Sequence, residues 1–435
     1  MQGKFNSFQK TMLQWDDVHP YNAVHVARVA GVLDAGRLRH SLSVGLEQCG
    51  LGHLVVHRNR SAYSYGSGSP ACELRILAVG NDATAALRAE LEWQINMRFV
   101  HGDGFTPFRF FALPLPLPAT DSFFLGLVYY HAVADAESIV VLLRHLVRCY
   151  LAEGTAAVLE LNRYPDARAH LLARHAGVVA QKLLAFPAQM RQLRQSCRPR
   201  YHKTDDFKNG FQFISVGSDR FHALICAAKD WGLTVNDLLL ALLLKCVSPL
   251  ADGRLRAGKR RKISVGCIVN LRRELGIDRV RVFGLFLGSF IVSHPVPHAA
   301  SLRELASDIR QQTLVVKRRQ LFLATPIDLA LGRFVLQFFR PDRRKKFYQK
   351  NYPLWGGLTN LNLNSMWEPA NADGLQDYFR GVSTGPATPL VLSVTTVGDH
   401  ANIGVSYRAA VFSGQDIERV QDHFMQQLEQ LHVPA

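Results

Sequence analysis

A histidine followed four residues later by an aspartate is the pattern in this sequence with the clearest use in chemistry. His131 and Asp135 belong to the segment YHAVADAES. An imidazole exchanges a proton near neutral pH, so His131 is a candidate general base. The same pattern from His202 to Asp206 lies in a polar stretch with no strand before it, and we interpret it as a chance match. For His131 taken alone, a histidine packed in the core remains an alternative interpretation.

The elements on either side of this pattern would hold the two side chains rigidly. Residues 123–130 are all apolar, aromatic or glycine, which predicts a strand buried on both faces. Residues 139–151 carry apolar side chains at helical spacing, and Gly154 follows as a stop. His131 is therefore expected at the end of a core strand and Asp135 at the start of a helix. In this position the imidazole would be attached to a rigid part of the backbone and would have access to a cleft.

The whole chain has the composition of a globular protein. It contains 435 residues, of which 48% are hydrophobic and 20% charged, and this length suits two or three domains. No apolar run approaches the length of a membrane span, and the N-terminus lacks the apolar core of a signal peptide. The seven cysteines are scattered without a C-x-x-C pair, so we expect free thiols and no metal site. These features predict a cytoplasmic protein.

The net charge of +16 indicates an acidic partner or substrate. Basic residues gather in 191–203, 254–262 and 340–350, each beside an apolar stretch. The candidates are the phosphates of coenzyme A, an acidic acyl carrier protein and an anionic membrane surface touched peripherally at the inner membrane. A solvated face without a partner is the alternative. We exclude nucleic acid because no nucleic-acid-binding motif accompanies these clusters.

Several segments together resemble the chloramphenicol acetyltransferase-like superfamily, which includes peptide-synthetase condensation domains, polyketide-associated acyltransferases and wax ester synthases. HAVADAES resembles the H-H-x-x-x-D-G segment of these enzymes. TVND at 234–237, NLR at 270–272, FGLFLG at 283–288 and LTN at 358–360 are similar to further segments of the wax ester synthase branch, in the same order.

The resemblance implies an α/β fold of two chloramphenicol acetyltransferase-like lobes, each a mixed sheet flanked by helices, with a tunnel between them. The first lobe is predicted at 1–185, with the H-x-x-x-D segment, and the second at 186–435. The implied activity is transfer of an acyl group from a thioester to a hydroxyl or amine. Acyl-CoA or a phosphopantetheinyl carrier would be the co-substrate, with no bound cofactor or metal, and the protein would be a monomer.

The resemblance also assigns roles to individual residues. His131 would be the general base, and Asp135 would form an ion pair that holds the loop. Other residues are carried over by position: Tyr130, Gly284 and Asn360 for substrate binding, and Asn270, Arg272 and Gly288 for structural support.

The sequence departs from the family pattern in a few places. Tyr130 replaces the first histidine, Ala136 replaces a glycine, and Leu285 stands where an asparagine is common. The arginine that usually pairs with the aspartate is not evident, so Arg58, Arg60 and Arg272 are the candidates for Asp135. Two alternatives therefore stay open: a stand-alone condensation enzyme that joins carrier-bound groups, and an inactive module that binds a carrier protein or a membrane.

Overall fold

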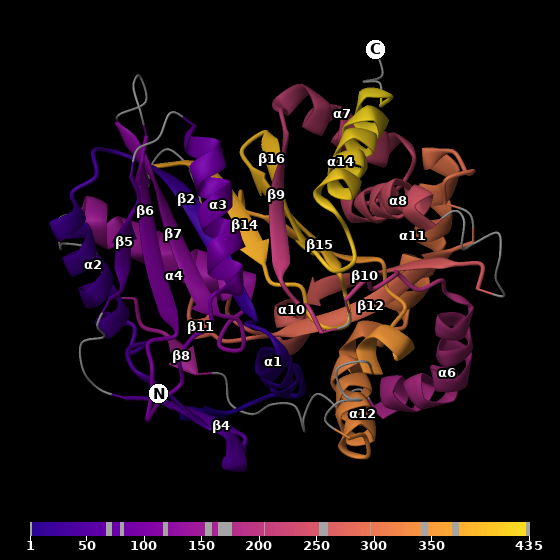
Figure 1. Cartoon of the computed structure of the whole chain (residues 1–435), viewed down its shortest axis with the longest axis horizontal. Helices are drawn as coiled ribbons and strands as arrows, with labels where there is room; N and C mark the ends of the chain where they lie inside the picture. The colour runs from indigo at the N-terminus through magenta and orange to yellow at the C-terminus, as the bar shows by residue number, and fades with distance from the viewer. Residues whose placement is uncertain are drawn as a thin grey trace.

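The computed structural model describes most of the chain. The described residues are 2–66, 72–78, 82–115, 121–152, 159–163, 176–203, 205–251, 260–295, 297–340, 347–367 and 374–431. They form two lobes, each built around one sheet (Figure 1).

The first lobe is a five-stranded mixed sheet with helices packed on it. The strand order is β14 (Leu375–Val382), β2 (Asn22–Ala30), β7 (Ser122–Tyr130), β6 (Phe108–Pro114) and β5 (Leu74–Ile76). Neighbouring strands are antiparallel except β5 and β6. The helices of this lobe are α1 (Ser7–Val18), α2 (Ala35–Gln48), α3 (Ala83–Asn96) and α4 (Ala136–Leu151). All nine residues of β7 are buried, which confirms the predicted core strand.

The second lobe is a six-stranded mixed sheet. Its order is β12 (Leu287–His294), β10 (Ile263–Asn270), β13 (Gly356–Asn362), β15 (Leu390–Val397), β16 (His400–Arg408) and β9 (Asn209–Val216). The helices of the second half are α6 (Ala176–Gln195), α7 (Ser218–Asp230), α8 (Val235–Val247), α10 (Arg272–Leu275), α11 (Leu302–Arg318), α12 (Thr325–Gln337) and α14 (Gly414–Glu429). The segment TVND at 234–237 also has the pattern of a capping box, and α8 begins there: the side chains of Thr234 and Asp237 each accept from the backbone amide of the other.

Short elements complete the chain. Two small sheets are formed by β1 (Gln2–Lys4), β4 (Ala62–Tyr65) and β3 (Leu54–His57), and by β11 (Val282–Phe283) and β8 (Asn162–Arg163). The 3₁₀ turns are η1 (Arg58–Arg60), η2 (Ser248–Ala251) and η3 (Leu321–Ala324). The stretch 302–339 is predicted to be helical with a break at Pro326, and it forms α11 and α12, separated by η3, with Pro326 in the first turn of α12. An amphipathic pattern predicts a helix over 171–194, and its first residues lie outside the described part of the chain, as do parts of the basic clusters at 254–262 and 340–350.

Strand β14 crosses from one lobe to the other. It comes from late in the chain, as its orange colour in Figure 1 shows, yet it pairs with β2 at the edge of the first sheet. Its backbone also approaches the second sheet so closely that a Cβ on Gly404 of β16 would overlap the carbonyl of Arg380. The division between the lobes at residues 185 and 186 remains a prediction. β14 lies in the predicted second lobe, 186–435, but belongs to the sheet of the first.

No single described helix is long and apolar enough to cross a bilayer. One bent pair, Ser218–Asp230 and Val235–Ala251 with 108° between the two parts, meets the criteria of length and composition only when both parts are joined.

Candidate active site

His131 occupies the first position after β7, at the face of the first lobe that meets the second. Its backbone amide donates to the Tyr21 carbonyl (3.2 Å), which ties the turn to the start of β2. The imidazole stacks on the Tyr21 ring, with centroids 5.4 Å apart and 19° between the planes. The Tyr129 ring packs against the imidazole edge-on at 5.4 Å. These contacts fix the direction of the ring.

The hydrogen bond of the imidazole determines which nitrogen can act as a base. Nδ1 lies 3.2 Å from the Ala134 carbonyl oxygen, and a carbonyl only accepts, so we assign the proton to Nδ1. Nε2 then carries the lone pair, and it makes no hydrogen bond to any described residue. The tautomer that the backbone selects is therefore the one with a proton-accepting Nε2.

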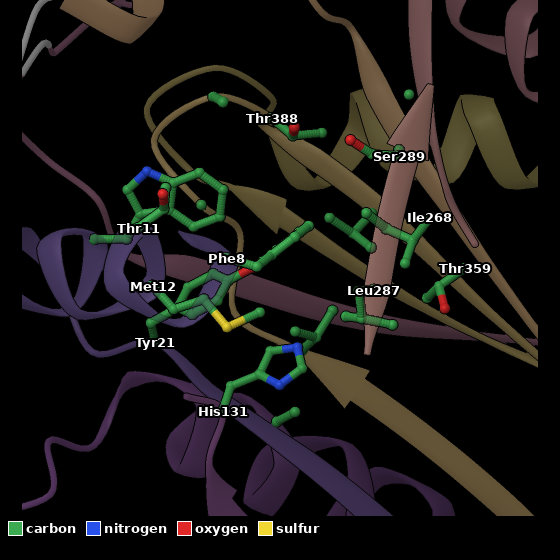
Figure 2. A pocket seen from close by; sticks show the side chains of 18 of the residues that line it. Phe8, Thr11, Met12, Tyr21, His131, Ile268, Leu287, Ser289, Thr359 and Thr388 are labelled. Carbon is green, nitrogen blue, oxygen red and sulfur yellow. The ribbon is translucent and has the colours of Figure 1, made fainter. Parts of the chain in front are cut away.

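The His131 ring lines a cavity of about 220 Å³ between the lobes. The first lobe supplies residues of α1 and β2 to its wall, and the second supplies residues of β10, β12, β13 and β15. Figure 2 shows the ring pointing into the space bounded by Tyr21 and Met12 on one side and Leu287 on the other. The imidazole is thus accessible from a space that both lobes enclose, as the sequence analysis requires.

Burial lowers the pKa of His131 from its usual 6.5 to about 4, and the positive charge of Arg380 contributes to this lowering. The hydrogen bond to Ala134 and the carboxylate of Asp135 oppose it. The ring is consequently neutral at physiological pH and can accept a proton from a bound substrate.

Asp135 points away from the cavity and forms a buried ion pair across the lobes. Its Oδ1 and Oδ2 lie 3.0 and 3.2 Å from Nη2 of Arg272, and both side chains are 1% exposed. Oδ1 also accepts from the Ser138 amide as the N-cap of α4. Of the three candidate partners Arg272 is thus the observed one, whereas Arg58 pairs with Asp17 at the surface.

The residues around this ion pair form a continuous set of hydrogen bonds, which we call the interlobe latch: Asp135, Ser138, Asn270, Arg272 and Gly284. Ser138 Oγ accepts from Arg272 (2.6 Å) and from the Gly284 amide (3.0 Å). The Gly284 carbonyl accepts from the Asp135 amide (2.9 Å) and Ser138 Oγ (2.8 Å). Asn270 Oδ1 accepts from the Arg272 amide, which sets the start of α10. The latch fixes the H-x-x-x-D turn against the second lobe.

No protein-family model matches this sequence, and no curated protein is significantly similar to it. Solved structures do match it over nearly its whole length. The first condensation domain of the calcium-dependent antibiotic synthetase, in complex with a substrate analogue, has a TM-score of 0.67 at 15% identity and covers 100% of this chain and 97% of its own. The EpoB cyclization-docking bidomain from Sorangium cellulosum has 0.68 at 14%, covering 100% and 85%. SgcC5 from Streptomyces globisporus has 0.64 at 14%, covering 100% of both chains. The chain has the condensation-domain fold. This result confirms the predicted two-lobed α/β architecture.

Within this condensation-domain fold, two of the predicted substrate-binding residues, Tyr130 and Asn360, do not line the cavity at His131. Tyr130 packs in an aromatic group with Phe99 and Phe105, because adjacent strand residues face opposite sides, and Tyr129 lines the cavity instead. Asn360 is exposed and lines a second, separate pocket, whereas its neighbour Thr359 faces the cavity. In both cases the alternation of side chains along a strand turns the predicted residue away from the cavity and its neighbour toward it.

The two predicted glycines lie outside the cavity wall of this condensation-type fold and act through the backbone. Gly284 belongs to the latch. A Cβ on Gly288 would lie 2.8 Å from the Phe322 carbonyl and 2.9 Å from Leu271. The absence of a side chain at Gly288 therefore permits close packing of β12.

The sequence analysis missed several polar cavity residues of this condensation-domain fold. They are His25, Tyr129, Thr359, Arg380 and Ser393. Tyr129 and Thr359 each stand next to a predicted residue, whereas His25, Arg380 and Ser393 lie in segments without a recognisable motif. Only the pairing of β14 with β2 brings Arg380 to the site. Among the described residues, no group of three histidine, cysteine, aspartate or glutamate side chains is arranged to hold a metal ion.

Proposed function

We propose that this protein transfers an acyl group from a thioester to a hydroxyl or amine acceptor, with His131 as the general base. The observation that carries the proposal is the orientation of the imidazole: Nδ1 lies at the Ala134 carbonyl, and the ring faces the interlobe cavity. The condensation-domain fold supports it, because the similar structures are condensation and cyclization domains.

The proposed reaction needs only the two substrates and His131. The acceptor oxygen or nitrogen attacks the thioester carbonyl carbon while its proton passes to Nε2. The tetrahedral intermediate then collapses, the carbon–sulfur bond breaks, and the leaving thiolate takes the proton from the imidazolium. General-base assistance of this kind contributes about a hundred- to ten-thousand-fold to the rate.

The donor is proposed to be acyl-CoA or an acyl group on a phosphopantetheinyl carrier, with no bound cofactor or metal. We place the protein in the cytoplasm as a monomer, with peripheral contact to the inner membrane as an option. All seven cysteines are free thiols, which suits a reducing compartment.

Product formation from labelled donors tests the proposed function. The purified protein is incubated with labelled acyl-CoA or labelled acyl carrier protein and a panel of alcohols and amines, and the products are identified by mass spectrometry. We expect an ester or amide and one equivalent of free thiol. Turnover with only one donor separates a CoA-dependent acyltransferase from a stand-alone condensation enzyme. Absence of transfer with both donors would support the inactive binding module.

The pH dependence of the reaction should reflect the low pKa of His131. Protonation of Nε2 abolishes its function as a base, so kcat/KM should stay level from about pH 8 down to about 5 and fall steeply only near 4. An ordinary histidine would lose activity already below about 6.5. Because the unfolded chain binds this proton at higher pH, stability also decreases as the pH falls from 6.5 toward 4. Circular dichroism at each pH separates the two effects.

Donor binding should weaken as salt is added. The net charge of +16 attracts the phosphates of either donor, and added ions screen that attraction. Between about 50 and 500 mM NaCl we expect the association rate of acyl-CoA to fall about tenfold. A neutral thioester lacking the nucleotide serves as the control and should bind independently of salt. If acyl-CoA and the neutral thioester showed the same salt dependence of binding, an electrostatic role for the basic residues would be wrong.

A further inference from the structure

Arg380 is a buried cation in the wall of the cavity. It lies on β14 and is 4% exposed. Its Nε donates to Thr395 Oγ1 at 2.7 Å, and its Nη2 donates to the carbonyls of Val394 and Thr359. All three acceptors are neutral. Within the part of the chain that the structure describes, Arg380 forms no ion pair, and its Nη1 makes no hydrogen bond.

The groups that face Arg380 supply no negative charge. Burial raises the pKa of Tyr129 and of Tyr378, so both phenols stay protonated. Burial lowers the pKa of His25 and of His131, so both rings are neutral. Burial also lowers the pKa of Arg380 to about 10, which still leaves the guanidinium charged at neutral pH. The cavity therefore has a net positive wall.

The other buried arginine near His131 has a counter-ion. Arg272 is 1% exposed and is paired with the Asp135 carboxylate. A buried charge without a counter-ion costs several kcal/mol, so proteins rarely keep one unless it has a partner. Arg109 and Arg408 are also buried and form no ion pair within the described residues, but neither lines the cavity. Arg380 does line it, so a ligand in the cavity can supply the missing counter-ion.

Ser393 provides a second, independent observation at the same place. It is 1% exposed, it lines the cavity, and its Oγ has no hydrogen-bond partner in the described part of the chain. Ser393 lies two residues before Thr395 on β15 and pairs in register with Thr359 on β13. Both threonines accept hydrogen bonds from Arg380, so Ser393 belongs to the strands that Arg380 contacts. A buried hydroxyl normally finds a partner. An orphaned donor and an uncompensated cation in the wall of one cavity form an arrangement that an anion would complete.

We propose that the cavity binds a substrate that carries a carboxylate, held by the Arg380 guanidinium and the Ser393 hydroxyl; this inference rests on the acyl-transfer function proposed above. A carboxylate would neutralise the buried charge and accept from both Nη1 and Oγ. The rest of the wall is largely apolar and aromatic, with Phe8, Trp15 and Tyr348 among its residues, so the body of the substrate is apolar.

The carboxylate can belong to either substrate, and the two cases differ chemically. An acceptor tethered to a carrier has its carboxyl group converted to a thioester and bears no charge there. A carboxylate on the acceptor therefore means a free hydroxy or amino acid. A carboxylate on the donor means an acyl chain with a second acid group.

Binding of a simple probe pair tests the carboxylate site without any turnover. The probes are 3-phenylpropanoate and 3-phenylpropanamide, which share shape and differ in charge, and calorimetry gives both affinities. We expect the acid to bind about tenfold or more tightly than the amide. Arg380→Met should abolish this preference, Arg380→Lys should keep part of it, and Ser393→Ala should reduce it.

Arg58→Met removes the same charge from the surface and should leave the preference intact. Equal affinities for acid and amide in the wild type, or a full preference in Arg380→Met, would overturn the proposal, as would failure of both probes to bind. Because Ser393→Ala removes only a hydroxyl, it remains informative if Arg380→Met does not fold.

Turnover then assigns the carboxylate to one substrate. In one arm, hydroxy and amino acids are compared with their amides as acceptors of a neutral acyl group. In the other, dicarboxylic acyl thioesters are compared with monocarboxylic ones. We expect kcat/KM to favour the charged member about tenfold or more in one arm, and Arg380→Met to remove that advantage. Ratios near one in both arms would reject the proposal even if His131 proves to be the base.

Discussion

Replacement of His131 by alanine should lower kcat/KM for acyl transfer by about a hundred- to ten-thousand-fold, because the acceptor loses the group that takes its proton. The imidazole packs against Tyr21 and Tyr129 at the cavity wall, outside the interlobe latch, so the fold should persist. The measurements are steady-state kinetics with the preferred donor and circular dichroism of the same sample.

His202→Ala is the matched control for this variant. His202 begins the other H-x-x-x-D pattern of the sequence, but it lies on an exposed turn and its backbone amide bonds Ala410. Its replacement should leave kcat/KM within about twofold of wild type, as is usual for surface substitutions. If a folded His131→Ala variant kept full activity, general-base catalysis by this residue would be wrong.

Removal of Arg272 should destabilise the protein by about 3–5 kcal/mol, because it leaves the Asp135 carboxylate buried without a counter-ion. Arg272→Met retains most of the side-chain volume while it deletes the bonds to Asp135 and Ser138. Urea unfolding gives the loss directly. Adding Asp135→Asn to Arg272→Met should recover part of the stability, since the unpaired charge is then gone as well.

Arg58→Met is the comparison for this loss. Arg58 and Asp17 also form an ion pair, at 2.7 Å, but their side chains are 46% and 52% exposed. Such a pair is worth about 0–1 kcal/mol because water and ions screen it. A similar small loss for Arg272→Met would show that the latch does not hold the lobes together.

The parts of the fold that depend on local patterns could be predicted from the sequence. An unbroken apolar run predicts β7, and helical spacing after Asp135 predicts α4. Both patterns can be seen in neighbouring residues, because the burial of a single helix or strand repeats with its own period. The capping box at Thr234 is equally local, since its two partners are three residues apart. His131 and Asp135 were identified for the same reason.

The parts that depend on distant pairing could not be predicted with the same certainty. Arg272 stood as one of three candidates because 137 residues separate it from Asp135, and only the packed lobes bring them together. β14 was missed entirely, since its sequence LQDYFRGV lacks a clean two-residue alternation and its partner strand lies in the other half. With β14 missed, Arg380 could not be placed at the site.

A third kind of difference arises from strand phase. Family resemblance locates a segment to within a residue, but a shift of one residue in a strand turns the side chain to the opposite face. That shift distinguishes Tyr130 from Tyr129 and Asn360 from Thr359. The resemblance thus located the correct segments, but in each segment the residue that faces the cavity is the neighbour of the predicted one.

The crossing of β14 has a mechanical consequence. β14 is paired with β2 in the first sheet, while its Arg380 donates to the carbonyls of Thr359 and Val394 in the second, so separating the two lobes would break one of these sets of hydrogen bonds. Opening the space around His131 therefore costs hydrogen bonds, which favours entry of substrates while the two lobes stay together.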